Sequence, residues 1–165
     1  MFNLTVYFER NFVKEYKMSK KASKIVEEFS EFKGLEKSLI RKICIGTELS
    51  KLGYIGVSKK IIQKLKNNEQ LTPEEALEYK EYPEKGVEIL AAKYKKEYDD
   101  IVVLGIISGH AERLDGCGYP FRISGKAISE TTYIASICIN FVEKFLQGKN
   151  IRPLNISAVI EGLIE

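Results

Sequence analysis

The chain has 165 residues, 44% of them hydrophobic and 30% charged, a globular mixture that excludes an intrinsically disordered protein. Its 26 basic and 23 acidic side chains leave a net charge of only +3, so we expect no nucleic-acid partner. No apolar run reaches the ~20 residues of a membrane-spanning helix, and the N-terminus lacks the pattern of a signal peptide. We therefore expect a single cytoplasmic domain over residues 1–165, least clearly defined over residues 1–33.

Residue types that bind metals or form disulfides are scarce. The chain has one histidine, His110. Its three aspartates are Asp99, Asp100 and Asp115, too few for a metal centre built from several histidines and aspartates. Its three cysteines are Cys44, Cys117 and Cys138, which lie far apart without a CxxC pair. This spacing excludes a zinc ribbon and favours free thiols in a reducing compartment.

Apolar residues recur at helical intervals along most of the chain, which predicts an all-α bundle of about seven helices. The expected helices cover residues 11–32, 35–49, 61–65, 73–82, 84–98, 99–114, 129–145 and 155–165. In the first helix, Phe12, Tyr16, Ile25, Phe29 and Phe32 share the helical spacing. Its lysines, between residues 14 and 24, form either a solvated face or an anion-binding surface.

The clearest local signal is a helix start at residues 72–75. Thr72 is a suitable N-cap, Pro73 occupies the first helical position, and Glu75 completes a capping box. We expect this helix to end near Tyr82, because Pro83 disfavours helical geometry in the residue before it.

His110 is expected on the apolar stripe of the 99–114 helix, with Val103 and Leu114, facing the core or a cleft. Glu112, two positions on, points away from His110 unless the helix ends first. No Ser/His/Asp triad is visible. The histidine is therefore either a core residue with its hydrogen bonds satisfied or a ligand of a bound group.

Residues 110–120 read HAERLDGCGYP, which resembles the HHExxDGxGYP signature of HD-GYP domains, a bacterial branch of the HD superfamily. Three further segments are similar to that family: TELSKLG (47–53) to HDxGKxG, LTPEE (71–75) to LTxEE, and YPEKGVEIL (82–90) to HPxxGxxIL. Residues 152–154 are similar to the segment after the family's last ligand helix. The resemblance covers about residues 18–165 and implies an HD-domain-like helical bundle.

HD-GYP domains, by this resemblance, are metal-dependent phosphodiesterases that hydrolyse cyclic di-GMP. Two or three iron or manganese ions, held by histidines and aspartates, activate a water for attack on phosphorus. In this chain Thr47, Tyr82, Ala111 and Ile139 stand where the family has metal ligands, and its early histidine falls near Met18. The resemblance thus implies no bound metal and no catalytic residue.

Four residues form the expected remnant of the family's pocket: Glu48, Lys51, Tyr82 and His110. Glu48 and His110 keep ligand-type side chains, and Lys51 matches a lysine that contacts the substrate phosphate in the family. One histidine and one carboxylate cannot assemble a dinuclear site.

The loop after His110 keeps the family's residues Arg113, Asp115, Gly116, Gly118, Tyr119 and Pro120. We expect its glycines to serve backbone geometry, and Tyr119 with Pro120 to form a rigid, partly apolar protrusion. The loop then either packs beneath the domain or presents a surface to a partner. By resemblance, that partner is a GGDEF-type diguanylate cyclase.

Three functions remain open. The first, which we favour, is a catalytically inactive domain that acts as a regulatory or protein-binding module in cyclic di-GMP signalling. The second is a cyclic di-GMP phosphodiesterase with an unusual metal site. The third is a non-hydrolysing nucleotide sensor in which Lys51 and Arg113 hold a phosphate.

Overall fold

The computed structural model describes residues 4–94 and 98–147. Within these ranges the chain forms α-helices and 3-10 turns and no β-strand, so the all-α prediction is confirmed. The elements are α1 (Leu4–Asn11), α2 (Val13–Phe32), α3 (Lys37–Leu49), η1 (Leu52–Gly56), α4 (Lys59–Lys66), α5 (Pro73–Lys80), α6 (Tyr82–Lys93), α8 (Ile101–Gly109), η2 (Gly125–Ala127) and α9 (Glu130–Gln147).

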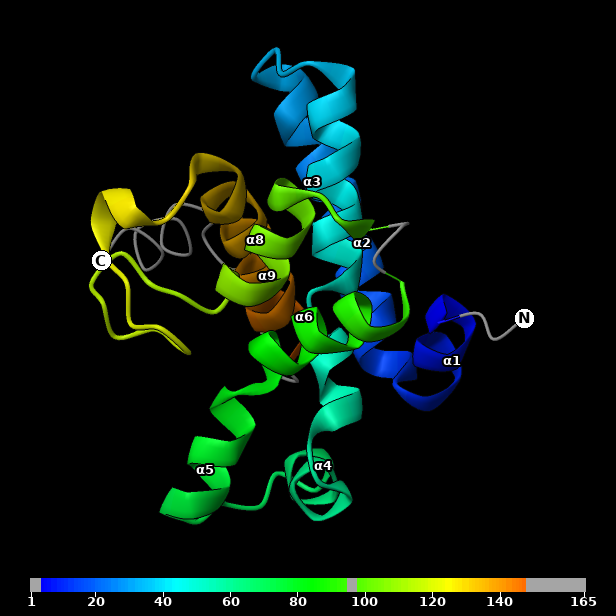
Figure 1. Ribbon diagram of the computed structural model, residues 1–165, viewed down its shortest axis with the longest axis vertical. Helices are drawn as coiled ribbons and strands as arrows, with labels where there is room; N and C mark the ends of the chain where they lie inside the picture. Colours follow the sequence, from blue (N-terminus) through cyan, green and yellow to red (C-terminus); the bar gives the residue numbers. More distant parts are fainter. Residues whose placement is uncertain (1–3, 95–97, 148–165) are drawn as a thin grey trace.

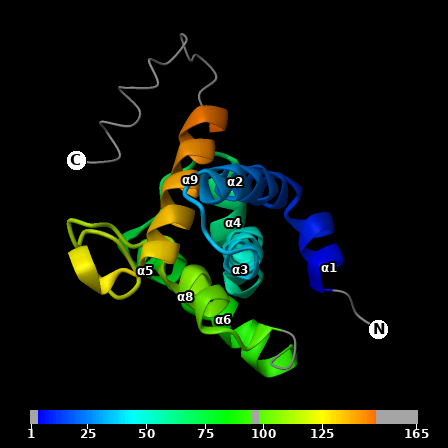
Figure 2. The same ribbon diagram turned by 90° about the horizontal axis from the view of Figure 1, so that it is seen from above.

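Helices α2, α3, α8 and α9 pack on one another and form the centre of the bundle. Helix α6 covers η1 and α8, while α4 and α5 lie together at one end of the molecule (Figure 1). Helix α1 and the loop between α8 and α9 lie on opposite sides of this centre (Figure 2). None of the helices in the described ranges has the length and hydropathy needed to cross a membrane.

The core falls into three clusters. The largest joins α2, α3, α8 and α9 through residues such as Val26, Ile43, Ile106 and Ala135. The second joins α1, α3, η1, α6 and α8, and the third centres on Tyr82. Gly53 allows η1 to pack closely on the start of α6. Any other residue at this position would place its Cβ only 1.6 Å from the Tyr82 carbonyl oxygen. This close approach places the residues before η1 beside Tyr82.

The capping box at residues 72–75 is confirmed. The Thr72 hydroxyl accepts from the Glu75 N–H at 3.2 Å, and the Glu75 carboxylate accepts from the Thr72 N–H at 2.9 Å. The helix ends at Lys80 rather than near Tyr82, and Pro83 instead lies in the first turn of α6. Proline is tolerated there because the first N–H groups of a helix have no partner within it.

Helix α1 was not predicted from the sequence, and the helix expected over residues 11–32 corresponds to α2 (Val13–Phe32). Phe29 and Phe32, expected on its apolar face, are 44% and 88% exposed. The buried face of α2 is formed mainly by small residues: Ser19, Ala22, Ser23, Val26 and Ser30. Small side chains on this face suit the close packing of α2 against α3 and α9.

The expected helix over residues 99–114 is also wrong at its end, because α8 stops at Gly109. The chain then folds back on itself: the Tyr119 N–H donates to the Ala111 carbonyl at 3.2 Å. Gly118 allows this return, since a Cβ there would lie 2.4 Å from the Glu112 Cα. Leu114 consequently lies outside the helix and is 43% exposed.

Two further expectations concern the end of α6 and the C-terminal residues. Helix α6 ends at Lys93 rather than near Tyr98. The helix expected over residues 155–165 and the segment at 152–154 lie outside the described residues.

Candidate functional site

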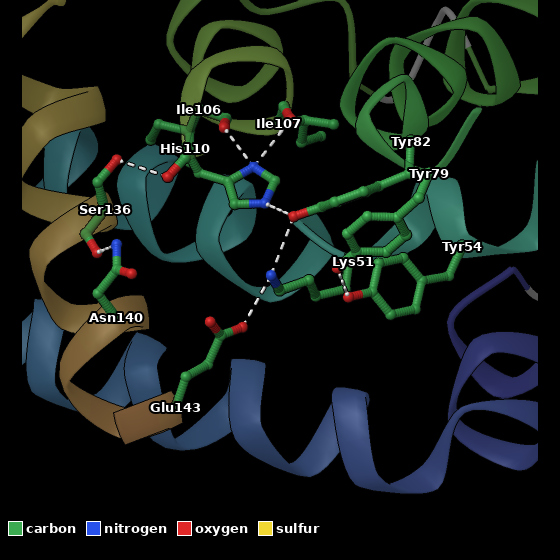
Figure 3. Close-up of polar contacts among 10 residues, drawn as sticks. All are labelled: Lys51, Tyr54, Tyr79, Tyr82, Ile106, Ile107, His110, Ser136, Asn140 and Glu143. Atoms are coloured by element: carbon green, nitrogen blue, oxygen red, sulfur yellow. Dashed lines mark hydrogen bonds and ion pairs between the residues drawn. The ribbon is translucent and has the colours of Figure 1, made fainter. Parts of the chain in front are cut away.

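Lys51, Tyr82 and His110 come from three parts of the chain and meet in the interior. Lys51 follows α3, Tyr82 is the first residue of α6, and His110 follows the last residue of α8. All three are buried, with Lys51 8%, Tyr82 0% and His110 2% exposed. Figure 3 shows their polar ends joined in a row.

The backbone fixes the direction of each hydrogen bond in this row. The Nδ1 atom of His110 lies 3.0 Å from the Ile107 carbonyl oxygen and 3.2 Å from that of Ile106. Carbonyl oxygens only accept, so Nδ1 carries the proton and Nε2 of the neutral ring is an acceptor. The Tyr82 hydroxyl therefore donates to Nε2 at 2.7 Å and accepts from the Lys51 ammonium at 3.0 Å.

Glu143 on α9 completes the network, and sequence reasoning missed it. Its carboxylate lies 2.8 Å from the Lys51 Nζ. The Lys51 side chain is 10% exposed and that of Glu143 29%, so the lysine is the deeper partner of this ion pair. A signal existed in the sequence: Glu143 follows Ile139 by four positions, and residues so spaced share one helix face.

Burial, together with the nearby positive charge of Lys51, lowers the pKa of the single histidine, His110, to about 3. Burial also opposes the charged form of Lys51, but Tyr82, Tyr54 and Glu143 outweigh it and raise the lysine pKa. Burial likewise raises the pKa of Tyr82. Near neutral pH the network therefore contains an ammonium, a phenol, a neutral imidazole and a carboxylate.

Aromatic rings enclose one side of the network. The Tyr82 ring contacts those of Tyr54, Tyr79 and Tyr119, with centroids 4.7, 5.3 and 6.1 Å away. The Lys51 Nζ lies 5.2 Å from the centroid of the Tyr82 ring, within range of a cation–π interaction. The Tyr54 and Tyr79 hydroxyls form their own hydrogen bond at 2.8 Å. These rings separate the lysine from solvent on this side.

A cavity of about 230 Å³ opens on the other side. It is lined by the three buried residues, by the segment 111–115 and by Tyr119, and by one face of α9 that includes Ile139, Asn140, Glu143 and Lys144. Ile139, at a former ligand position by the resemblance, is buried at 4% exposure. The wall next to His110 is therefore apolar at that point.

The loop after His110 borders this cavity with Glu112, Arg113 and Tyr119. Because α8 ends at Gly109, Glu112 lines the same cavity as His110. Its Oε1 accepts from the Phe121 N–H at 2.6 Å, whereas its buried Oε2 has no hydrogen-bond partner among the described residues. Tyr119 is half-buried and packs toward Tyr82, so it faces inward rather than protruding.

Two charged residues of the loop, Arg113 and Asp115, are at the surface. Arg113 and Asp115 form an ion pair at 2.6 Å, with side chains 59% and 35% exposed. This pairing lowers the pKa of the Asp115 carboxyl to about 2. Gly116 has a φ of +74°, a conformation that favours glycine.

The structure does not bring Glu48 to this cavity. Its carboxylate binds the Lys20 ammonium at 2.8 Å and the Ser23 hydroxyl at 3.2 Å, both on α2. The neighbouring Thr47 is buried and donates its hydroxyl to the Ile43 carbonyl at 2.8 Å. Of the four residues of the expected remnant pocket, three line the cavity and Glu48 does not.

These side chains do not fit a metal centre. The Nε2 lone pair of His110 is occupied by the Tyr82 hydroxyl, and a lysine ammonium lies 3.0 Å from that same hydroxyl. A cation there would be repelled by Lys51 and would displace an internal hydrogen bond. Within residues 4–94 and 98–147, no three histidine, cysteine or acidic side chains are grouped so that they could hold a metal ion.

Comparison with known proteins identifies one family. Residues 9–150 match the HD domain, which is most of the chain. No curated protein is significantly similar to it. An HD domain suggests the superfamily of metal-dependent hydrolases, and the helical fold described above is that of the family. The chain belongs to the HD domain family.

Proposed function

We propose that this chain is a degenerate HD-GYP domain that does not hydrolyse cyclic di-GMP and acts as a regulatory or protein-binding module in cyclic di-GMP signalling. One observation carries the proposal: the Tyr82 hydroxyl occupies the histidine Nε2 at 2.7 Å, where a metal-binding imidazole needs a free lone pair. Paired metals are what activate water in the resembled family. The metal ligands of that family are replaced in this chain, and the remaining histidine is held in a hydrogen-bonded network with Tyr82, Lys51 and Glu143.

The loop supports the HD-GYP assignment. Gly116 at φ +74° and Gly118 against the Glu112 backbone occupy positions where the sequence pattern requires glycine. Arg113 and Asp115 remain at the surface beside the cavity mouth. A GGDEF-type diguanylate cyclase is the partner that the resemblance favours for this surface.

Elemental analysis and a turnover assay on the purified chain test the loss of hydrolysis. We expect no stoichiometric iron or manganese, and no linear pGpG or GMP above background when cyclic di-GMP is supplied with Mn²⁺. An active HD-GYP phosphodiesterase assayed beside it provides the positive control. About two transition-metal ions per chain with turnover would instead support a working dinuclear site.

A nucleotide sensor is the second candidate, because the cavity of about 230 Å³ is lined by the cations Lys51, Arg113 and Lys144. Arg113 and Lys144 are exposed, and an anionic ligand would compete with the Asp115 carboxylate for Arg113. Calorimetry with cyclic di-GMP and no metal separates the candidates. Binding that is lost in Arg113→Gln would favour the sensor, and no heat at any concentration would favour the protein-binding module.

A further inference from the structure

A groove of about 680 Å³ runs between α6 and α8, on the face of α8 that points away from the bundle centre. The two helices lie side by side (Figure 1) and pack on each other beneath the groove. Loop residue Phe121 also lines it. The groove shares no lining residue with the cavity at Lys51 and His110.

The apolar lining of this groove is unusually accessible. Ile101 and Phe121 are 88% and 52% exposed, and Val87 and Leu104 between them are half-buried. Gly105 faces open space, since a Cβ there would meet only the Thr132 hydroxyl, at 3.8 Å. Single exposed apolar residues are ordinary, but two of them with half-buried apolar neighbours in one groove offer a partner an apolar surface to cover.

Among the residues that the structure describes, those with charged side chains that line the groove are all acidic. Glu84 and Glu88, one helical turn apart on α6, and Asp99 before α8 all line it and are exposed. In the described part of the chain these three carboxylates have no ion pair, and no lysine, arginine or histidine lines the groove. Other carboxylates are paired, such as Glu75 with Lys64 at 2.7 Å and Asp100 with Lys42 at 2.9 Å. In a chain of net charge +3, the groove is a local reversal of charge.

We propose that this groove binds a basic amphipathic helix of a partner protein. The apolar stripe of such a helix would cover Ile101, Leu104 and Phe121, and its lysines or arginines would meet the three carboxylates. A groove between two helices fits a third helix, because side chains of packed helices interlock at such surfaces. This surface goes beyond the proposed regulatory function, since it lies outside the cavity that the function concerns.

The test uses the full chain and a fluorescent synthetic helical peptide, with leucine at i, i+3, i+4 and i+7 and lysine on the flanks. A matched peptide carries glutamate in place of lysine. Ile101→Asp is the test variant, and Phe32→Asp on α2 is its control, because both side chains are 88% exposed. The two variants make the same change of net charge, and the carboxylate that Ile101→Asp adds to the groove would attract the lysine peptide, so weaker binding by this variant reports the lost apolar contact.

We expect anisotropy to show binding of the lysine peptide but not of the glutamate peptide. Ile101→Asp should weaken the binding at least tenfold and Phe32→Asp should leave it unchanged, with thermal melts confirming that both variants fold. Equal binding by the two variants, or by the two peptides, overturns the proposal. Light scattering that shows a dimer dissociated by Ile101→Asp would also overturn it, because a second copy would then be the occupant.

Discussion

The cavity at the end of α8 and the groove between α6 and α8 differ in whether their polar side chains have partners among the described residues. On the inner face, at the end of the helix, the side-chain nitrogen and oxygen atoms of His110, Tyr82 and Lys51 all have partners within the chain. On the outer face, Glu84, Glu88 and Asp99 have no ion pair within the described residues. Ile101 lies beside them, 88% exposed.

This difference separates a role in stability from a role in binding. A buried charge that loses its partner costs several kcal/mol, so removing one member of the inner network should destabilise the fold. Exposed charges and apolar groups contribute little to folding and remain available to another molecule. Four changes test this contrast, from the interior to the surface.

The largest effect is expected for Lys51→Met. The variant leaves Glu143 and the Tyr82 hydroxyl without their shared donor, which should lower the free energy of unfolding by about 3 kcal/mol in urea denaturation. The control is Lys60→Met, whose side chain is 74% exposed and pairs with Glu75 at 3.0 Å. That change should cost less than about 1 kcal/mol. Equal losses in both variants would contradict the importance of the interior network.

Stability should fall in mild acid because of the buried histidine. Its folded pKa is about 3, whereas the unfolded pKa is the ordinary 6.5, so the unfolded chain binds more protons between these values. The free energy of unfolding should therefore drop by about 2 kcal/mol from about pH 7 to about pH 5, before carboxyl groups titrate. The drop should be absent in His110→Leu. A wild-type curve that is flat over this range would show that His110 can charge in place.

Tyr82→Phe tests the hydroxyl at the centre of the network, which forms hydrogen bonds with both Lys51 and His110. It removes only the hydroxyl, leaves the His110 Nε2 buried without a donor, and should cost about 1.5 kcal/mol in unfolding free energy. Tyr16→Phe on the partly exposed surface of α2 should change little. If the two substitutions cost the same, the hydroxyl between Lys51 and His110 has no special role.

The smallest effect is expected for Glu88→Lys in the groove. Glu84 and Glu88 are like charges at i and i+4, and relieving their repulsion should stabilise α6 by about 0.3 kcal/mol. The same change should weaken binding of the lysine peptide. A clear loss of stability would mean that Glu88 serves the fold, contrary to a role in the groove.

Local signals predicted much of this fold. The capping box at Thr72 and the apolar run before His110 identified two helices, because both depend on neighbouring residues alone. Helix ends were predicted less well. The end of α8 at Gly109 depends on the return of the loop over Gly118, a contact that does not follow the helical spacing and that periodicity therefore does not report.

The candidate site was predicted in part. Lys51, Tyr82 and His110 were expected to lie together, and they line one cavity. Glu48 was expected with them, but α2 offers Lys20 and Ser23, which draw its carboxylate to the other side of α3. Glu143 was missed because pairing with Lys51 is set by the packing of α9, not by sequence proximity.

The most direct test of the central claim uses the single histidine, which gives one set of imidazole signals in ¹⁵N NMR spectra. The account predicts a neutral ring protonated at Nδ1, with ¹⁵N shifts unchanged between about pH 5 and pH 8 and unaffected by Zn²⁺. Tyr82→Phe should alter the Nε2 shift, since that atom loses its donor. A titration centred near the ordinary histidine pKa, or a Zn²⁺-dependent Nε2 shift, would contradict an imidazole held by Tyr82 and Lys51.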